Sequence, residues 1–173
     1  MISFLGYTIT QADEIHLSGI AKVLNYFVEK NLTADLGSFG GDDRIFTYIQ
    51  DMSKLPFVVV LHNEIPIGFG LLKHDCKSET FSHSAEFSFF IMPEHVGKGV
   101  ASAMFKIMEE RAVQLGIWNI FMAISSNRSD SFSFYRKMGY VECGRLPKIG
   151  YKNESYFDIV YFQKSLIELN GNL

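Results

Sequence analysis

The stretch IMPEHVGKGVAS, residues 91–102, leads from an apolar run through a proline into a Gly-Lys-Gly turn. The run before it, AEFSFFIM over residues 85–92, has the aromatic and apolar content that is typical of a strand. Behind the turn, apolar residues recur at helical spacing: Val100, Met104, Ile107, Met108 and Leu115. The stretch therefore predicts a strand that passes through a glycine turn into a helix over residues 97–115.

The residues alone leave two readings of the Gly-Lys-Gly turn open. Glycines expose backbone N–H groups and a helix N-terminus carries partial positive charge, so the turn could bind an anion. It could equally be a tight strand-to-helix connection that needs small residues. The dinucleotide-binding motif does not fit, because Ser102 stands where its third glycine belongs. The P-loop does not fit either, because Met92 and Gly99 stand where it needs a glycine and a Ser or Thr.

The rest of the chain alternates strand and helix patterns, separated by turn residues. The predicted strands span residues 6–12, 56–62, 64–75, 85–92, 117–125, 139–146 and 155–166, and the predicted helices 13–30, 44–53, 97–115 and 128–138. No repeat, low-complexity tract or linker interrupts the chain, and 173 residues is a length typical of one domain. We therefore expect a single domain over residues 1–173 of the α/β (α+β) class, with a mixed, mostly antiparallel sheet of six or seven strands flanked by about four helices.

Composition narrows the class of protein. The net charge of −3 gives no electrostatic footprint for nucleic acid, and no run approaches the ~18 apolar residues of a membrane span. Cys76 and Cys143 form no CxxC pair and no cluster of metal-ligand spacing, so neither a metal site nor a disulfide is predicted. The N-terminus lacks the basic and apolar regions of a signal peptide, which favours the cytoplasm.

The glycine turn resembles the phosphate loop of the GNAT superfamily of N-acetyltransferases, whose pattern is Arg/Gln-x-x-Gly-x-Gly/Ala. Residues 96–101 match it, except that Val96 stands where Arg or Gln is usual. The resemblance implies that acetyl-CoA is the co-substrate, and that its pyrophosphate lies on this loop while its pantetheine arm aligns with the backbone at the end of the preceding strand. The cofactor-binding residues implied are Phe90, Ile91, Met92, Val96, Gly97, Lys98, Gly99, Val100, Ala101 and Ser102. Lys98 is equally readable as a solvated loop lysine.

Two later stretches extend the resemblance. The residues SFSFYRKMGY (131–140) resemble the superfamily's Ser-x-x-x-Tyr-x-Lys-x-Gly-Phe, which implies a cofactor contact for Ser131. The Asn that usually stands three residues before this Ser is Arg128 here, and Asn127, one place earlier, is the candidate for its role. The tail over residues 144–166 looks like that of phosphinothricin-type acetyltransferases, a branch that acts on amino-acid-like amines.

Glu86 is the candidate general base. An amine attacks a thioester only as the neutral base, whereas an alkyl ammonium has a pKa near ~10.4, so a proton must be removed near neutral pH. On the predicted strand 85–92, Glu86 lies among aromatic residues, where desolvation would raise its pKa toward a useful value. In the phosphinothricin-type branch a glutamate stands at this same distance, ten residues before the position held by Val96. The alternative is a solvated or salt-bridged glutamate on an edge strand.

Tyr135 is the candidate acid for the departing thiolate, whose parent pKa is near ~8.5 by analogy with cysteine. It stands where the superfamily commonly places that acid. The alternative is a core tyrosine that packs Phe132 against the sheet. His95 and His83 are alternative proton carriers, although a lone His is more often structural or exposed.

These observations predict an acetyl-CoA-dependent N-acetyltransferase that acts on a primary amine, with a small amino-acid-like molecule as the first choice of acceptor. No Cys or Ser lies in a nucleophile motif, which favours direct transfer in a ternary complex over an acetyl-enzyme. The alternatives are acetylation of a protein N-terminus or lysine, and a catalytically weak acyl-CoA-binding module, which Val96 favours. Acidic residues of a polar loop suggest a cationic acceptor, or are simply solvated: Asp35, Asp42 and Asp43. Many relatives pair as homodimers, which the ring-rich C-terminal region allows.

Overall fold

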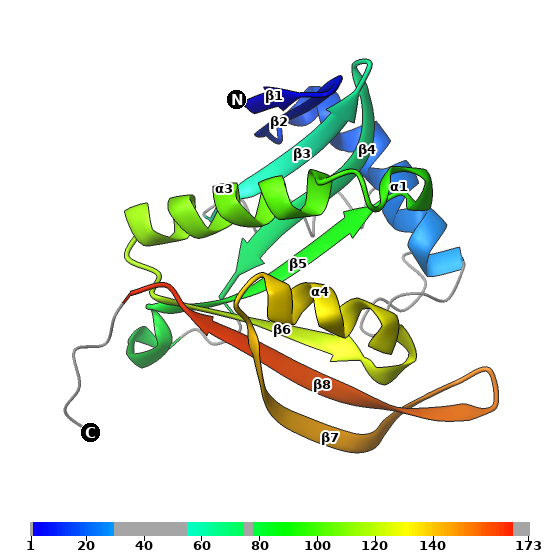
Figure 1. Ribbon diagram of the computed structural model, residues 1–173, viewed down its shortest axis with the longest axis vertical. Helices are drawn as coiled ribbons and strands as arrows, with labels where there is room; N and C mark the ends of the chain where they lie inside the picture. The colour runs from blue at the N-terminus through cyan, green and yellow to red at the C-terminus, as the bar shows by residue number, and fades with distance from the viewer. Residues whose placement is uncertain (1, 30–54, 75–77, 168–173) are drawn as a thin grey trace. The chain divides into compact units, whose positions relative to one another are not determined.

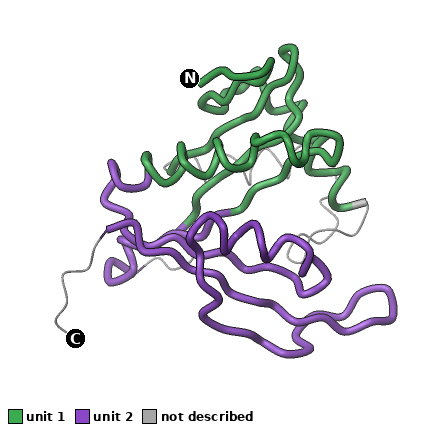
Figure 2. Tube along the Cα trace, viewed as in Figure 1, with its two compact units in different colours: residues 1–73, 88–111 green, residues 74–87, 112–173 purple. Residues whose placement is uncertain are grey.

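The computed structural model describes residues 2–29, 55–74 and 78–167, and the chain packs as two compact units (Figure 2). Unit 1 contains Met1–Lys73 and Ser88–Arg111, and unit 2 contains His74–Phe87 and Ala112–Leu173. The chain therefore passes from one unit to the other within a strand and again within a helix. That residues 1–173 act as one domain stays a prediction. The predicted helix 44–53, Cys76 and the three loop aspartates lie outside the described residues.

Within the described residues, eight strands form a mixed, mostly antiparallel sheet in the order β1-β2-β3-β4-β5-β6-β8-β7 (Figure 1). The strands are β1 (Ile2–Phe4), β2 (Tyr7–Gln11), β3 (Phe57–His62), β4 (Ile65–Lys73), β5 (Ser84–Ile91), β6 (Asn119–Ser125), β7 (Val141–Lys152) and β8 (Ser155–Ser165). β5 and β6 are parallel, and the pairs β1–β2, β2–β3, β3–β4, β6–β8 and β7–β8 are antiparallel. This confirms the predicted fold class.

Three α-helices lie within the described residues: α1 (Leu17–Glu29), α3 (Val100–Gln114) and α4 (Phe132–Lys137). Short 3-10 turns precede or connect them: η1 (Glu14–His16), η2 (Glu79–Phe81), η3 (Pro93–His95) and η4 (Ser126–Ser131). α1 begins after a capping box in which Asp13 and His16 each bond the other's backbone, so the helical pattern from residue 13 starts as a 3-10 turn.

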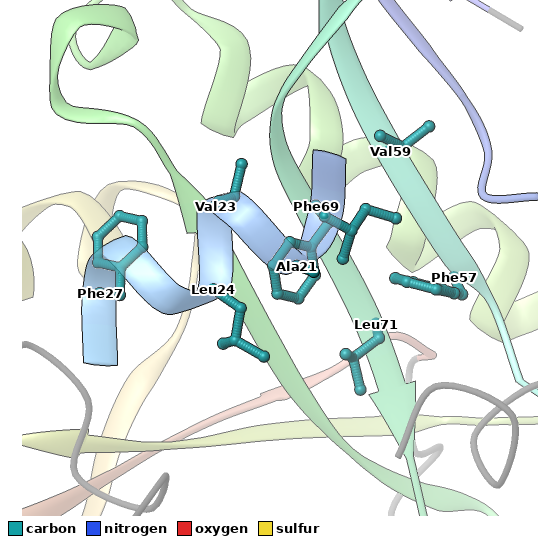
Figure 3. Close-up of a cluster of buried hydrophobic side chains, with 9 residues drawn as sticks. Ala21, Val23, Leu24, Phe27, Phe57, Val59, Phe69 and Leu71 are labelled. Atoms are coloured by element: carbon teal, nitrogen blue, oxygen red, sulfur yellow. The ribbon is translucent and has the colours of Figure 1, made fainter. Parts of the chain in front are cut away.

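In unit 1 the core lies between α1 and the strands β3 and β4 (Figure 3). Ile20, Val23, Leu24 and Phe27 bury one face of α1 at helical spacing. Strand alternation then places the helices on opposite faces of β5. The Phe90 ring lies 5.3 Å from that of Phe27 in α1, and the Phe89 ring lies 5.0 Å from that of Phe105 in α3.

In unit 2, α4 packs its aromatic side on β8. The rings of Phe132 and Tyr135 lie 5.1 and 5.4 Å from that of Phe162. Trp118, at the start of β6, stacks flat on His83 with 3.8 Å between ring centroids. These contacts hold α4 and the ends of β5 and β6 within the same unit.

The sheet has more strand than the sequence predicted. The predicted six or seven strands become eight, because the three-residue β1 is too short to show alternation. β7 also extends to Lys152, where the prediction ended at residue 146. β7 runs through Pro147, which lacks an N–H, because β7 is last in the strand order and an edge position tolerates this loss. The register shifts between Leu146 and Gly150, so the chain bulges there.

Asp158 on β8 holds this bulge. Its carboxylate accepts from the backbone N–H of Lys148 at 2.8 Å and from Nη1 of Arg145 at 3.0 Å. These bonds, first that from Lys148, hold the pKa of Asp158 below its ordinary value.

We expect Asp158→Asn to lower the melting temperature at pH 7, because the neutral amide loses the charge-assisted bonds. A carboxylate with a lowered folded-state pKa adds stability above its ordinary pKa and loses it as pH falls through the folded value. The difference between wild type and variant should therefore shrink as pH falls below the ordinary Asp value of ~3.9. Melting curves from pH 7 to pH 2.5 measure it, with Glu154→Gln at the exposed hairpin tip as the matched charge control. Equal melting temperatures at pH 7 would contradict this role.

Candidate active site

The loop between β5 and α3 has glycines where its backbone φ angles are positive. Gly97 and Gly99 have φ values of +79° and +81°, in the left-handed region that glycine adopts without strain. A Cβ built on either would meet no atom within 4 Å, so close packing is not what requires them. The left-handed backbone of the turn, and not crowding by neighbouring atoms, is therefore what requires glycine at these two positions.

The same loop presents backbone N–H groups at the start of α3. The Ala103 N–H donates to the Gly99 carbonyl at 3.0 Å, which is the first turn of the helix. The N–H groups before it have no partner inside the helix, and the helix dipole adds partial positive charge there. Lys98 is exposed in the middle of the loop. The loop therefore fits an anionic diphosphate, with Gly97, Lys98, Gly99, Val100, Ala101 and Ser102 as the residues that would hold it.

Val96 contributes differently from these residues. Its side chain is 68% exposed, while its own N–H donates to the Pro93 carbonyl at 3.1 Å and closes η3. The Val96 N–H is therefore already used, and its isopropyl side chain faces solvent. An Arg or Gln at this position would extend a polar group into the same space.

The end of β5 sharpens the predicted pantetheine contact. The Met92 N–H donates to the Ile67 carbonyl at 2.8 Å, and the Phe90 carbonyl lies 2.6 Å from where a Cβ on Gly68 would stand. The backbone groups of residues 90 and 92 therefore point toward β4. Because strand residues alternate, the N–H and carbonyl of Ile91 point the other way. Of the three predicted residues, Ile91 is the one whose backbone can align an extended ligand on the side away from β4.

Glu86 is buried inside the sheet. It lies on β5 in register with Phe121 of the parallel strand β6, and it is 7% exposed. Within the described residues it is the only charged residue that is buried. Its neighbours Ala85 and Phe87 are buried as well. The solvated edge-strand alternative is therefore wrong, and a carboxylate withdrawn from water in this way is uncommon in a protein core.

Tyr135 is buried in α4, 5% exposed. Burial raises the pKa of its phenol, while a hydrogen bond with Ser131 and the positive charge of Arg128 lower it in part. The phenol therefore stays protonated throughout the neutral range. The core-tyrosine alternative is correct as a description of its packing, but it leaves the protonated hydroxyl in place as a proton donor.

Ser131 and Asn127 lie on η4. The Ser131 hydroxyl donates to the Arg128 carbonyl at 2.6 Å, besides its bond with the Tyr135 phenol. The side chain of Asn127 is exposed, and its N–H donates to Ser125 Oγ at 3.3 Å. Arg128 has non-helical angles, φ −109° and ψ 29°, which kink η4 between the two predicted residues.

The two alternative proton carriers have different surroundings. The Nδ1 atom of His83 bonds the Gly116 carbonyl at 2.7 Å, and its ring stacks on Trp118. The Nδ1 atom of His95 lies 2.9 Å from the hydroxyl of Tyr7, a buried residue 88 positions away in the sequence. No pattern in the sequence links Tyr7 to His95, so sequence reasoning missed this contact.

The predicted site residues are divided between the two units. Unit 1 holds Phe90, Ile91, Met92, the loop from Val96 to Ser102, and His95. Unit 2 holds Glu86, Asn127, Ser131 and Tyr135. In the part of the chain that the structure describes, no group of His, Cys, Asp or Glu could hold a metal ion, and no helix is long and apolar enough to span a membrane.

Comparisons with known proteins agree with this fold. The model of the acetyltransferase (GNAT) family matches residues 25–140, more than half of the chain. The L-amino acid N-acyltransferase MnaT of Escherichia coli is 23% identical over 128 residues, covering 73% of this chain and 74% of the relative. The L-methionine sulfoximine/L-methionine sulfone acetyltransferase of Salmonella typhimurium is 22% identical and covers 93% and 95%. A solved phosphinothricin acetyltransferase of Sinorhizobium meliloti, in complex with AcCoA, is 19% identical, with a TM-score of 0.89 and coverage of 98% and 93%.

Proposed function

The chain belongs to the GNAT family of acetyltransferases and uses acetyl-CoA as its co-substrate, and we propose that it acetylates the primary amine of a small amino-acid-like molecule by direct transfer. Two relatives named for L-amino acids and for L-methionine sulfoximine or sulfone support this class of acceptor. Acceptors of this class carry a carboxylate beside an α-amino group. The α-amino group of a peptide N-terminus has a pKa near ~8, and a neighbouring carboxylate raises the pKa further by stabilising the ammonium form, so most of the amine is protonated at neutral pH and requires a base.

The observation that carries this proposal is the burial of Glu86, ten residues ahead of the glycine loop. An ionised carboxylate is expensive to bury, so its place inside the sheet has to be compensated. A base at a reaction centre must lie within hydrogen-bond reach of its substrate, directly or through one water, in a site that excludes bulk solvent. Burial at this position meets the second condition.

The proton balance assigns one role to each catalytic side chain. Bound acetyl-CoA supplies the acetyl group as an activated thioester. A bond forms between the amine nitrogen and the acetyl carbon while the carbon–sulfur bond breaks. Glu86 takes the proton that the amine loses, directly or through water, and Tyr135 donates a proton to the departing sulfur. The raised pKa of the Tyr135 phenol keeps that proton available at neutral pH.

The test is an acceptor screen in which the release of coenzyme A thiol is followed with acetyl-CoA and a panel of amines. Free amino acids and their sulfoximine, sulfone and phosphinic analogues should give the highest kcat/KM. Peptides with free N-termini or lysines form the second arm, and higher kcat/KM for them would replace the small acceptor by a protein. Tight acetyl-CoA binding in calorimetry with no thiol release from any amine would identify a binding module instead, and the exposed Val96 is the observation that favours this second candidate.

Tyr135→Phe is expected to lower kcat about 10- to 100-fold, because it removes the proton donor and keeps the ring. The ring contacts with Phe134 and Phe162 remain, so the melting temperature should change little. Tyr140→Phe is the matched control, since Tyr140 is another buried tyrosine of unit 2. Stopped-flow thiol detection measures both variants. Equal kcat values for Tyr135→Phe and wild type would leave Tyr135 with its packing role alone.

We also propose a homodimer formed through β7 and β8, in a single-domain protein of the cytoplasm. Along β7 nearly every residue is exposed, and an exposed edge strand with apolar side chains is prone to pair with another chain. The exposed apolar residues of this hairpin are Val141, Leu146, Ile149, Tyr151 and Tyr156. Light scattering should give twice the chain mass of 19.7 kDa.

The cytoplasm is reducing, and the free, exposed thiol of Cys143 suits such a compartment.

A further inference from the structure

Three aromatic side chains with titratable groups meet in unit 1 immediately before the glycine loop: Tyr7 of β2, His62 of β3 and His95 of η3. The Tyr7 hydroxyl lies 2.9 Å from Nδ1 of His95, and the two rings meet edge to face at 5.5 Å and 89°. The His62 ring lies 5.0 Å from that of His95 and 4.8 Å from that of Tyr7. Since Tyr7 is only 4% exposed, it is a fixed anchor for His95.

The imidazole of His95 lies within electrostatic reach of the loop. Only Val96 separates it from Gly97, and two residues span at most about 7 Å of chain. The Debye length is about 8 Å at physiological ionic strength, so a charge on the loop is only partly screened at the ring. The Lys98 ammonium group, after burial, lowers the pKa of the His95 imidazole, which is the effect expected of a loop charge near the ring.

The groups that face His95 decide its charge in the free protein. Burial lowers its pKa most, followed by Lys98 on its own segment and His62 from β3, while Glu94 raises it. The hydroxyl of Tyr7 from β2 bonds Nδ1, and which of the two donates depends on the tautomer of the imidazole. The ring is therefore mostly neutral at pH 7, and an added anion would shift it toward the imidazolium.

We propose that His95 is an additional cofactor-binding residue, held by Tyr7 beside the glycine loop, whose imidazolium pairs with the coenzyme A diphosphate. The inference rests on the proposed function, because it takes the diphosphate to lie on the loop. When the anion binds, the imidazole takes up one solvent proton and its Nδ1–H donates to the Tyr7 oxygen. Lys98 and His95 then share the negative charge, which offers a substitute for the Arg or Gln that Val96 replaces.

Calorimetric titration with coenzyme A near pH 7, in buffers of different ionisation enthalpy, measures the protons taken up on binding. Wild type should take up a larger fraction of a proton than His95→Gln. The 3′-phosphate of coenzyme A titrates equally in both, so the difference belongs to His95. The affinity of wild type relative to His95→Gln should rise about three- to tenfold as pH falls from 8 to 6. Tyr7→Phe keeps the ring contacts but removes the oxygen that accepts Nδ1–H, so proton uptake should fall toward that of His95→Gln.

His74→Gln is the matched control, since His74 is exposed and lies in unit 2, and it should leave proton uptake unchanged. Equal proton uptake and equal affinity for wild type, His95→Gln and Tyr7→Phe across this pH range would overturn the role of His95 while leaving the proposed function standing. Failure of wild type to bind coenzyme A at all would overturn both. If His95→Gln does not fold, Tyr7→Phe decides the question alone, because Phe fits the buried site of Tyr7.

Discussion

Glu86→Gln is expected to lower kcat about 10²- to 10³-fold while the affinity for acetyl-CoA stays within about twofold. Gln has nearly the same shape as Glu, so the packing between Ala85 and Phe87 is kept and only the proton acceptor is lost. The melting temperature of the variant is measured beside kcat. A fall in kcat in a variant that stays folded at the assay temperature separates catalysis from folding.

The pH profile of this variant tests the role of the base directly. As pH rises toward and through the pKa of the acceptor's α-amino group, more of the amine reaches the enzyme already neutral and needs a base less. The ratio of wild-type to variant kcat/KM should therefore shrink between pH 7 and pH 9.5. Glu79→Gln, the same change on the exposed turn η2, should give wild-type values throughout. A ratio that is constant with pH would assign Glu86 to positioning instead of proton transfer.

Local signals in the sequence were sufficient for the part of the fold around the glycine loop. The strand pattern before it and the helical pattern after it specify β5 and α3, because each has a regular apolar period. The helix begins at Val100, three residues later than predicted. Gly97 and Gly99 have left-handed backbone angles, which an α-helix cannot contain, so they lie before its first turn. β1 and the far half of β7 were missed for physical reasons. The first is too short for a period, and the second passes through Pro147 and a bulge that Asp158 of another strand stabilises.

The candidate site divides in the same way. Glu86 and the loop residues are adjacent to recognisable local patterns, so their types and spacing could be read from the chain. The sequence could not predict which backbone N–H and carbonyl groups are free to bind a ligand. That Val96 uses its N–H within η3, and that Ile91 turns its backbone away from β4, depends on partners such as Pro93 and Ile67. The contact between Tyr7 and His95 joins residues 88 positions apart, and long-range contacts of this kind leave no local trace.

Gly99→Val is expected to weaken coenzyme A binding about 10- to 100-fold. A β-branched residue is a genuine outlier at the φ of +81° that Gly99 adopts, so the loop must leave this conformation or carry about 1–2 kcal/mol of strain. Either change misdirects the N–H groups at the start of α3, and each charge-assisted bond to a phosphate is worth about 1.5–3 kcal/mol. Calorimetry with coenzyme A gives the Kd directly.

Gly116→Val provides a control that matches the strain without touching the loop. Gly116 follows α3, has a φ of +76°, and, like Gly99, has no atom within 4 Å of a built Cβ. The two variants should therefore lose similar stability, about 1–2 kcal/mol each, in chemical denaturation. If only Gly99→Val also loses affinity for coenzyme A, Gly99 is required for ligand binding and not only for the stability of the fold. Equal Kd values for the two variants would mean that the cofactor phosphates do not depend on this backbone, and the anion-binding role of the Gly-Lys-Gly turn would be wrong.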